Sequence, residues 1–150
     1  CFWGVEYYMQ KLPGVISVVS GYSGGSVENP TYQQVCSGQT GHLEVVDVKY
    51  NPYKVTFEEL TKRFLEIHDP TQSNGQGPDI GSQYLSAIFY STDEEKTTAN
   101  NLLDLLRKKK IKPATKVIKF DKFWKADDDH QDYYNRKGSL PYGHSYKKLF

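Results

Sequence analysis

Two kinds of hydrophobic periodicity alternate along this chain, and their order restricts the fold more than any other feature. Runs rich in β-branched or aromatic residues, which predict strands, cover residues 15–22, 42–50, 84–90 and 115–120. Segments with apolar residues three or four positions apart, which predict helices, cover residues 2–11, 56–68 and 92–110. This order predicts an α+β fold: a two-layer sandwich with a ferredoxin-like α/β plait core, helices on a small and largely antiparallel sheet, long functional loops and an irregular C-terminal tail.

Capping residues mark the starts of two of these helices. The Thr-x-x-Glu pattern of a capping box occurs twice, as Thr56 with Glu59 and as Thr92 with Glu95. One further helical turn is expected between Thr31 and Gly38, and a short polar helix over residues 127–137.

The length of 150 residues fits one domain, so we treat residues 1–150 as a single unit. No apolar stretch approaches the roughly 20 residues of a membrane span, and no signal-peptide pattern is visible. Two cysteines are too few for a disulfide-stapled scaffold, which predicts free thiols and a cytoplasmic protein; a disulfide between Cys1 and Cys36 is the less favoured alternative.

Charge excludes a general nucleic-acid binder, because 19 Lys and Arg stand against 18 Asp and Glu. The basic run over residues 107–116 is the local exception. Cations at the end of a helix favour the negative end of its dipole, so we interpret this run as a solvated helix terminus in preference to a polyanion site.

Cys1 is the first candidate catalytic residue. It precedes the predicted helix of residues 2–11, where unpaired backbone N–H groups and the helix dipole favour a thiolate. The alternative is a small buried hydrophobic side chain, the commoner role of a cysteine.

Glu44 is the second candidate. Because side chains alternate along a strand, Glu44 shares a face with Val46 and Val48. A carboxylate among valines is costly to ionise, so its pKa is expected to rise and the group to hold a proton near neutral pH. The alternative is a strand-end glutamate in contact with water.

The loop "HDPTQSNGQGPDIGSQY" is the third candidate, because so long a connection in one domain is usually functional. Its glycines permit close approach to a ligand, and Asp79 and Tyr84 add a carboxylate and a phenol near its end. It lacks the lysine and the following helix of a P-loop. The four histidines have no metal-ligand spacing, so no metal site is expected.

Long motifs spread over the whole chain resemble those of the A-type peptide methionine sulfoxide reductases. They are "CFWGVE", "GYSGG", "NPTYQQVCSGQTGHLEVV", "HDPTQSNGQGPDIGSQYLSAIFY" and "DDHQDYY". The resemblance implies a single catalytic domain that reduces the S epimer of methionine sulfoxide, free or in proteins, through a cysteine sulfenic acid and without a cofactor.

The same resemblance implies roles for individual residues. Cys1 would attack the sulfoxide sulfur, and Glu44 would protonate its oxygen. The hydroxyls of Tyr32 and Tyr84 would hydrogen-bond that oxygen, with Asp79 ordering the polar side of the site. The pocket for the substrate methyl group would consist of Phe2 and Trp3.

The sequence departs from the family pattern in its recycling residues and at its start. Gly143 stands where members fused to a B-type reductase domain often carry a cysteine, and Cys36 is the alternative resolving residue. Partners would be a thiol reductant such as thioredoxin or a monothiol, and a fused B-type domain. A glycine-rich strand is expected before Cys1, which we take to be missing from the given chain. A genuine N-terminal cysteine would instead suggest an N-terminal-nucleophile amidohydrolase.

Overall fold

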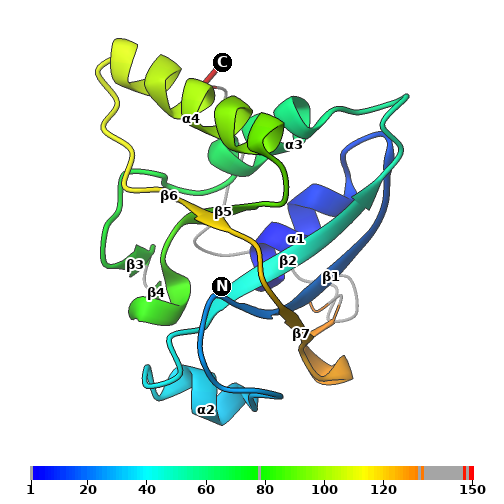
Figure 1. Cartoon of the computed structure of the whole chain (residues 1–150), viewed down its shortest axis with the longest axis vertical. Coiled ribbons are helices and arrows are strands. Elements are labelled where there is room, and N and C mark those ends of the chain that lie inside the picture. The colour runs from blue at the N-terminus through cyan, green and yellow to red at the C-terminus, as the bar shows by residue number, and fades with distance from the viewer. Residues whose placement is uncertain (1, 78, 132, 134–146, 148) are drawn as a thin grey trace.

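The computed structural model describes residues 2–77, 79–131, 133, 147, 149 and 150, in a mixed arrangement of helices and short strands (Figure 1). The helices are α1 (Phe2–Gln10), α2 (Tyr32–Cys36), α3 (Phe57–Glu66) and α4 (Asp93–Lys108), with 3-10 turns at η1 (Ser82–Tyr84) and η2 (Asp128–His130). The strands are β1 (Val15–Ser23), β2 (Leu43–Tyr50), β3 (Gly75–Gln76), β4 (Asp79–Ile80), β5 (Ala87–Tyr90), β6 (Lys116–Lys119) and β7 (Phe123–Lys125). The predicted α+β class is confirmed.

The strands described form three small sheets, where one largely antiparallel sheet was expected. The largest sheet has the order β2-β1-β7 and is antiparallel. Strands β3 and β4, of two residues each, form an antiparallel hairpin, and β5 pairs with β6 in parallel. In the largest sheet Tyr22 of β1 lies opposite both Glu44 of β2 and Trp124 of β7. These three residues therefore follow one another across the sheet.

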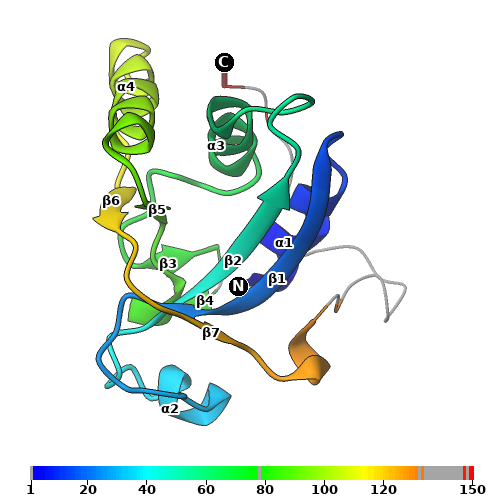
Figure 2. The ribbon, with the colours of Figure 1, turned by 45° about the vertical axis from the view of Figure 1, so that its right-hand side comes forward.

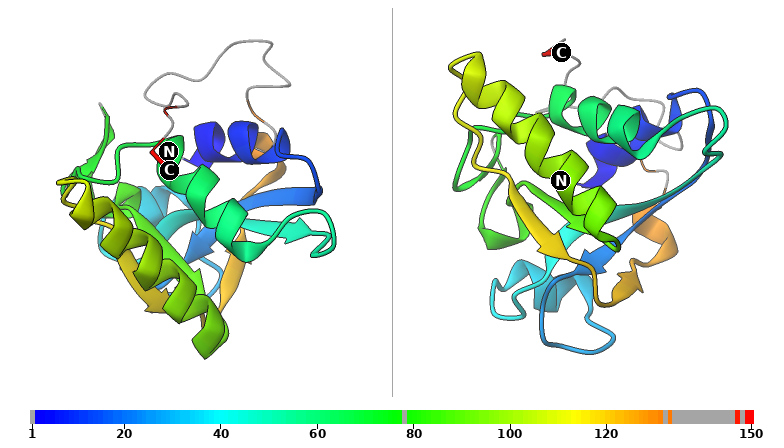
Figure 3. Two further views of the ribbon diagram at one scale, coloured as in Figure 1. Left: turned by 90° about the horizontal axis from the view of Figure 1, so that it is seen from above. Right: turned by 45° about the horizontal axis from the view of Figure 1, so that its top comes forward.

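Two apolar clusters pack the helices α1, α3 and α4 against the strands. Helix α1 packs on β1 and β2, with a buried cluster of Met9, Val18, Val55, Leu60 and Ile67. A second cluster, Leu65, Ile88, Ala99, Leu102, Leu103 and Leu106, joins α3 and α4 to β5. Figure 2 and the right view of Figure 3 show α3 and α4 side by side, at the opposite end of the molecule from α2. Burial of apolar surface thus holds β1 and β2 against α1 and α3 in the first cluster, and β5 against α3 and α4 in the second.

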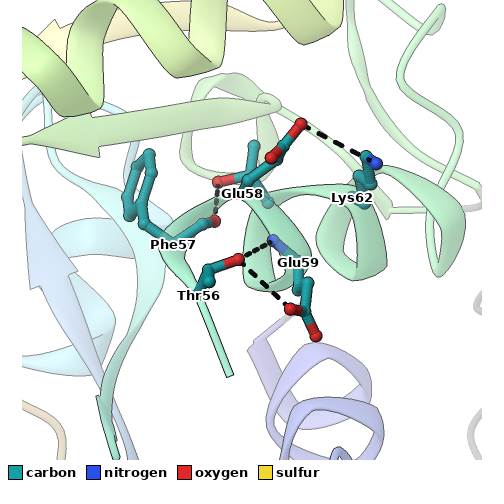
Figure 4. A network of polar contacts seen from close by, with 6 residues as sticks. Thr56, Phe57, Glu58, Glu59 and Lys62 are labelled. Carbon is teal, nitrogen blue, oxygen red and sulfur yellow. Dashed lines mark hydrogen bonds and ion pairs between the residues drawn. The ribbon is translucent and has the colours of Figure 1, made fainter. Parts of the chain in front are cut away.

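The helices begin where their capping residues predict. Thr56 Oγ1 accepts a hydrogen bond from the backbone N–H of Glu59 at 3.1 Å, and Glu58 pairs with Lys62 at 3.8 Å on the same helix (Figure 4). Thr92 caps α4 in the same way. The turn expected after Thr31 is α2, which carries a full capping box with Gln34. Each cap satisfies backbone donors that the first helical turn leaves unpaired.

Four expectations on local structure differ from what is observed. The third strand begins at Ala87 and not at Tyr84, because Ser82–Tyr84 form a 3-10 turn. The loop before it contains the β3–β4 hairpin, and β7 was not predicted. Of the polar helix expected over residues 127–137, Asp128–His130 form a 3-10 turn and Tyr133 is helical, while residues 132 and 134–137 lie outside the description.

None of the helices in the described part of the chain is long and apolar enough to cross a membrane.

Candidate functional site

The Glu44 side chain is hydrogen-bonded to the start of α1. It lies near the beginning of β2, and its Oε1 accepts a hydrogen bond from the backbone N–H of Phe2 at 3.2 Å. This N–H belongs to the first helical turn, which has no partner within the helix, and the positive end of the helix dipole also favours an acceptor here. The sheet register therefore brings the predicted acid to the helix terminus that follows Cys1. Cys1 itself lies outside the described residues.

The environment of Glu44 raises its pKa from an ordinary 4.5 to about 7. Burial is the largest cause, and the charge of Asp79 acts in the same direction. The hydrogen bond from Phe2 stabilises the carboxylate and opposes the shift. The shift has the direction that the valine-lined face predicts, and it leaves Glu44 partly protonated at neutral pH.

Two half-buried phenols belong to the same electrostatic cluster. Tyr32 is the first residue of α2, and Tyr84 is the last residue of η1. Burial, followed by the charge of Glu44, raises the pKa of Tyr84 to about 12. Burial, followed by the neighbouring Cys36 thiol, raises the pKa of Tyr32 as well. Both hydroxyls are therefore neutral hydrogen-bond donors at any physiological pH.

Cys36, the last residue of α2, is exposed and has a free thiol. Its position beside Tyr32, one helical turn away, places a second thiol at the edge of the cluster.

Phe2 and Trp3 belong to an aromatic cluster at the start of α1. Phe2 is 2% exposed and its ring lies 5.7 Å from that of Tyr22. Trp3 is half-buried and stacks on Tyr133, with the ring centroids 3.9 Å apart and an interplanar angle of 10°. The two residues that were expected to bind a methyl group thus have rings held by packing against other rings.

His130 connects this cluster to the phenols. Its Nδ1 accepts a hydrogen bond from the indole N–H of Trp3 at 3.3 Å, and its ring lies 4.3 Å from that of Tyr32. Neither His130 nor Tyr133 was assigned a role from the sequence. Both fall in "DDHQDYY", and their presence in a long family motif was the available signal.

Asp79 is held beside Glu44 and Tyr84 by the loop of residues 69–81. Side-chain amides replace regular structure there: Gln76 accepts from the backbone N–H of Asp69 at 2.8 Å and donates to its carbonyl at 3.1 Å. Gln72 bonds the backbone N–H of Gly77 in the same manner, at 2.7 Å. Asp79 starts β4 and is half-buried, and its charge raises the pKa of both neighbours.

A cavity of about 380 Å³ runs from this cluster into the molecule between β2 and β5. Phe2, Glu44 and Tyr84 line its polar end, and the walls farther in carry apolar side chains such as Val46, Val48 and Ile88. Within the described residues no three His, Cys, Asp or Glu side chains are grouped so that they could hold a metal ion.

A family model described as "Peptide methionine sulfoxide reductase" matches residues 1–149. "Peptide methionine sulfoxide reductase MsrA" of Sulfolobus acidocaldarius is 46% identical over 143 residues, covering 95% of this chain and 81% of the relative. "Peptide methionine sulfoxide reductase MsrA/MsrB" of Vibrio cholerae is 48% identical over 139 residues, covering 91% of this chain but 37% of that longer protein.

Solved structures lead to the same family. Reduced Mxr1 from Saccharomyces cerevisiae superimposes with a TM-score of 0.89 at 34% identity, covering 98% of this chain and 87% of that one. Mxr1 in complex with Trx2 matches with a TM-score of 0.61 at 26% identity, covering 97% of this chain and 83% of that one. These similarities give no support to the amidohydrolase alternative. The chain therefore belongs to the peptide methionine sulfoxide reductase family, in its MsrA branch, and is a thiol-dependent enzyme that reduces methionine sulfoxide to methionine.

Proposed function

We propose that the cluster around Glu44 reduces the S epimer of methionine sulfoxide, free or within proteins, with Cys1 as the nucleophile. The Cys1 sulfur attacks the sulfoxide sulfur, the sulfoxide oxygen passes to Cys1, and methionine leaves as the thioether. Cys1 becomes a sulfenic acid, the first step of the cysteine oxidation ladder. The observation that carries this proposal is the Glu44 carboxyl, with a pKa of about 7, hydrogen-bonded to Phe2, the residue next to Cys1.

Glu44 acts as the general acid of this reaction. A sulfoxide oxygen is a poor leaving group until it is protonated, so a proton donor is needed close to the attacking thiol. A carboxyl group with a pKa near 7 retains a useful fraction of its acid form at neutral pH.

The hydroxyls of Tyr32 and Tyr84 donate hydrogen bonds to the sulfoxide oxygen as charge develops on it. Burial keeps both phenols neutral, so each retains its proton for this purpose. Asp79 contributes indirectly, because its charge helps to keep Glu44 protonated.

Phe2 and Trp3 bind the terminal methyl group of the substrate. The stacking of Trp3 on Tyr133 and its hydrogen bond to His130 fix the indole plane, which supports this role. A rigid aromatic pocket for one substituent of the sulfur distinguishes the methyl side from the chain side and so selects one epimer.

Recycling requires a thiol reductant, which removes the sulfenic oxygen as water and is itself oxidised to a disulfide. We propose either a monothiol that reduces Cys1 directly or thioredoxin; the complex of Mxr1 with Trx2 supports the second. Cys36 is the resolving candidate on this chain because it lies beside Tyr32. Gly143 lies outside the described residues. The fused MsrA/MsrB relative supports a B-type domain as a further partner.

For the fold, we propose that a strand before Cys1 completes a ferredoxin-like plait by inserting between β2 and β5. Both are edge strands of their sheets in the described part of the chain, and the cavity between them is lined mainly by apolar residues. Inserted backbone would satisfy donors and acceptors on both edges.

Mass spectrometry of the intact protein tests the proposed chemistry. After one equivalent of the S-sulfoxide without reductant, Cys1 of the Cys36→Ser variant, which cannot form an internal disulfide, is expected to gain one oxygen atom, which a dimedone adduct would locate. The Cys1→Ser variant is expected to gain none and to have no activity. An acyl adduct on Cys1 would establish the amidohydrolase instead.

A further inference from the structure

Positive charge is concentrated in one segment of this nearly neutral chain. Residues 107–125 carry nine of the 19 Lys and Arg residues and a single acid, Asp121, and thus a net charge of +8. The remainder carries ten basic and 17 acidic residues, a net charge of −7. We call residues 107–125 the basic segment.

The cations of the basic segment face solvent. All nine side chains are exposed. Arg107 pairs with Asp104, Lys125 lies 3.8 Å from Asp128, and Lys109 donates to the carbonyl of Leu149. The other six make no ion pair with any described residue: Lys108, Lys110, Lys112, Lys116, Lys119 and Lys122. Their charge is therefore available to a partner.

Local structural needs account for only part of this charge. Arg107 and Lys108 complement the dipole of α4, which acts over its last turn. Lys116 and Lys119 lie on β6, which is an edge strand in the described part of the chain, where lysines oppose strand pairing between molecules. Lys110, Lys112 and Lys122 lie in neither place, and in the sequence they extend the two groups along the whole basic segment, which we also call the basic stripe.

The stripe ends beside the candidate site. Figure 1 shows the segment, yellow to orange, passing from the end of α4 through β6 to β7. In the sheet, Trp124 of β7 and Glu44 of β2 lie on either side of Tyr22, which puts them about 10 Å apart, two strand spacings. Ser23 donates to the carbonyl of Lys122 at 2.5 Å and fixes this end of the stripe to β1.

We propose that the basic segment is a docking surface for acidic polypeptide segments, which it guides so that a methionine sulfoxide in the same polypeptide reaches the Glu44 site. The proposal rests on the proposed function, because it takes the substrate to be a polypeptide. A short acidic peptide segment would contact the basic segment alone, whereas a long polyanion would also extend over the net negative remainder of the surface. Complementary charge accelerates encounter and fades as salt screens it.

Two peptides test this surface, each with a central methionine-S-sulfoxide, flanked by glutamates in one and by glutamines in the other. At low ionic strength, with dithiothreitol as reductant, kcat/KM for the glutamate peptide is expected to exceed that for the glutamine peptide by about tenfold. The preference should decline toward unity as salt is added. Equal use of the two peptides at low salt would overturn the proposal.

Charge reversal locates the effect. The variant K116E/K119E/K122E is expected to lose the preference, while the matched variant K11E/K54E/K96E, whose lysines are exposed elsewhere, keeps it. The N-acetyl amide of methionine-S-sulfoxide, which is small and neutral, should be reduced equally by all three proteins; failure there would count against the proposed function and not against docking.

Fluorescence anisotropy with a labelled glutamate peptide gives a readout that does not depend on catalysis. Binding is expected to weaken about tenfold in the stripe variant and not in the matched variant. A preference retained by the stripe variant, or tighter binding of single-stranded DNA of equal charge, would refute a surface for acidic polypeptides. A loss confined to turnover with thioredoxin would assign the stripe to the reductant instead.

Discussion

At the scale of single residues, the position of Glu44 in the fold gives its carboxyl group a pKa that suits the proposed role of general acid. Burial raises its pKa, and the nearby charge of Asp79 adds to the effect. The hydrogen bond from Phe2 moderates the shift and orients the carboxyl toward the start of α1. The balance leaves a group that can both hold and release a proton near pH 7.

Replacing this acid is the most direct test of its role. Glu44→Gln keeps the size of the side chain but cannot donate a proton, so single-turnover oxidation of the enzyme by the S-sulfoxide should slow by about 10²-fold or more. In the parent protein the rate attributable to Glu44 should fall as pH rises through about 7, because only its protonated form donates. An unchanged rate in the variant at neutral pH would remove Glu44 from the mechanism.

The hydrogen bond between Trp3 and His130 should control substrate affinity. His130→Phe keeps an aromatic ring but loses the acceptor for the indole N–H, so KM should rise by about two- to tenfold, the usual worth of one hydrogen bond. Trp3→Phe should act similarly, and the double variant should be little worse than Trp3→Phe alone, since both remove one interaction. Trp124→Phe is the matched control. Fully additive effects would show that the bond does not position Trp3.

These residues differ in how far the sequence could predict them. Glu44 follows from alternation along one strand, a local pattern that also gives the direction of its pKa shift. His130 and Tyr133 could not be found this way, because the partner of Trp3 is 127 residues distant in the chain and no periodicity connects them. Their contacts arise only from tertiary packing.

At the scale of elements, the capped helices were predictable and the irregular segments were not. Thr56 and Thr92 mark helix starts because their hydroxyls bond backbone donors within three residues. The loop of residues 69–81 is ordered by Gln72 and Gln76, whose amides imitate backbone pairing, and a glutamine carries no signature of that role. Strand β7 is only three residues long, too short for any periodicity to show.

Gly75 should be essential to this loop. A Cβ atom at that position would lie 2.1 Å from the carbonyl oxygen of Asp79, so Gly75→Ala must displace the β3–β4 hairpin. We expect a loss of about 1–3 kcal/mol in stability. We also expect a downward shift of the pH midpoint for single-turnover oxidation, because Asp79 would move from Glu44. Ser73→Ala, in the same loop and exposed, is the control. An unchanged midpoint would mean that Asp79 has no electrostatic role.

At the scale of the whole molecule, the proposed cycle closes when a thiol reduces the sulfenic acid on Cys1. If Cys36 resolves the sulfenic acid on Cys1, Cys36→Ser should lose turnover with thioredoxin and keep turnover with a monothiol, which attacks Cys1 directly. Turnover equal to that of the parent protein with both reductants would exclude Cys36 from recycling. The measurement is steady-state methionine release with each reductant.

Global stability should record the protonation of Glu44. In the folded state this carboxyl keeps its proton up to about pH 7, whereas in the unfolded chain it loses it near 4.5. Between these values the folded state binds more protons, so the free energy of unfolding must fall as pH rises and level off above about 7. Relative to Glu44→Gln, which does not titrate, the parent should lose at most about 3 kcal/mol over this range. Urea titrations between pH 4.5 and 8 measure it. Glu58→Gln, an exposed surface change, should follow the parent, and parallel curves for the parent and Glu44→Gln would show that folding does not perturb Glu44.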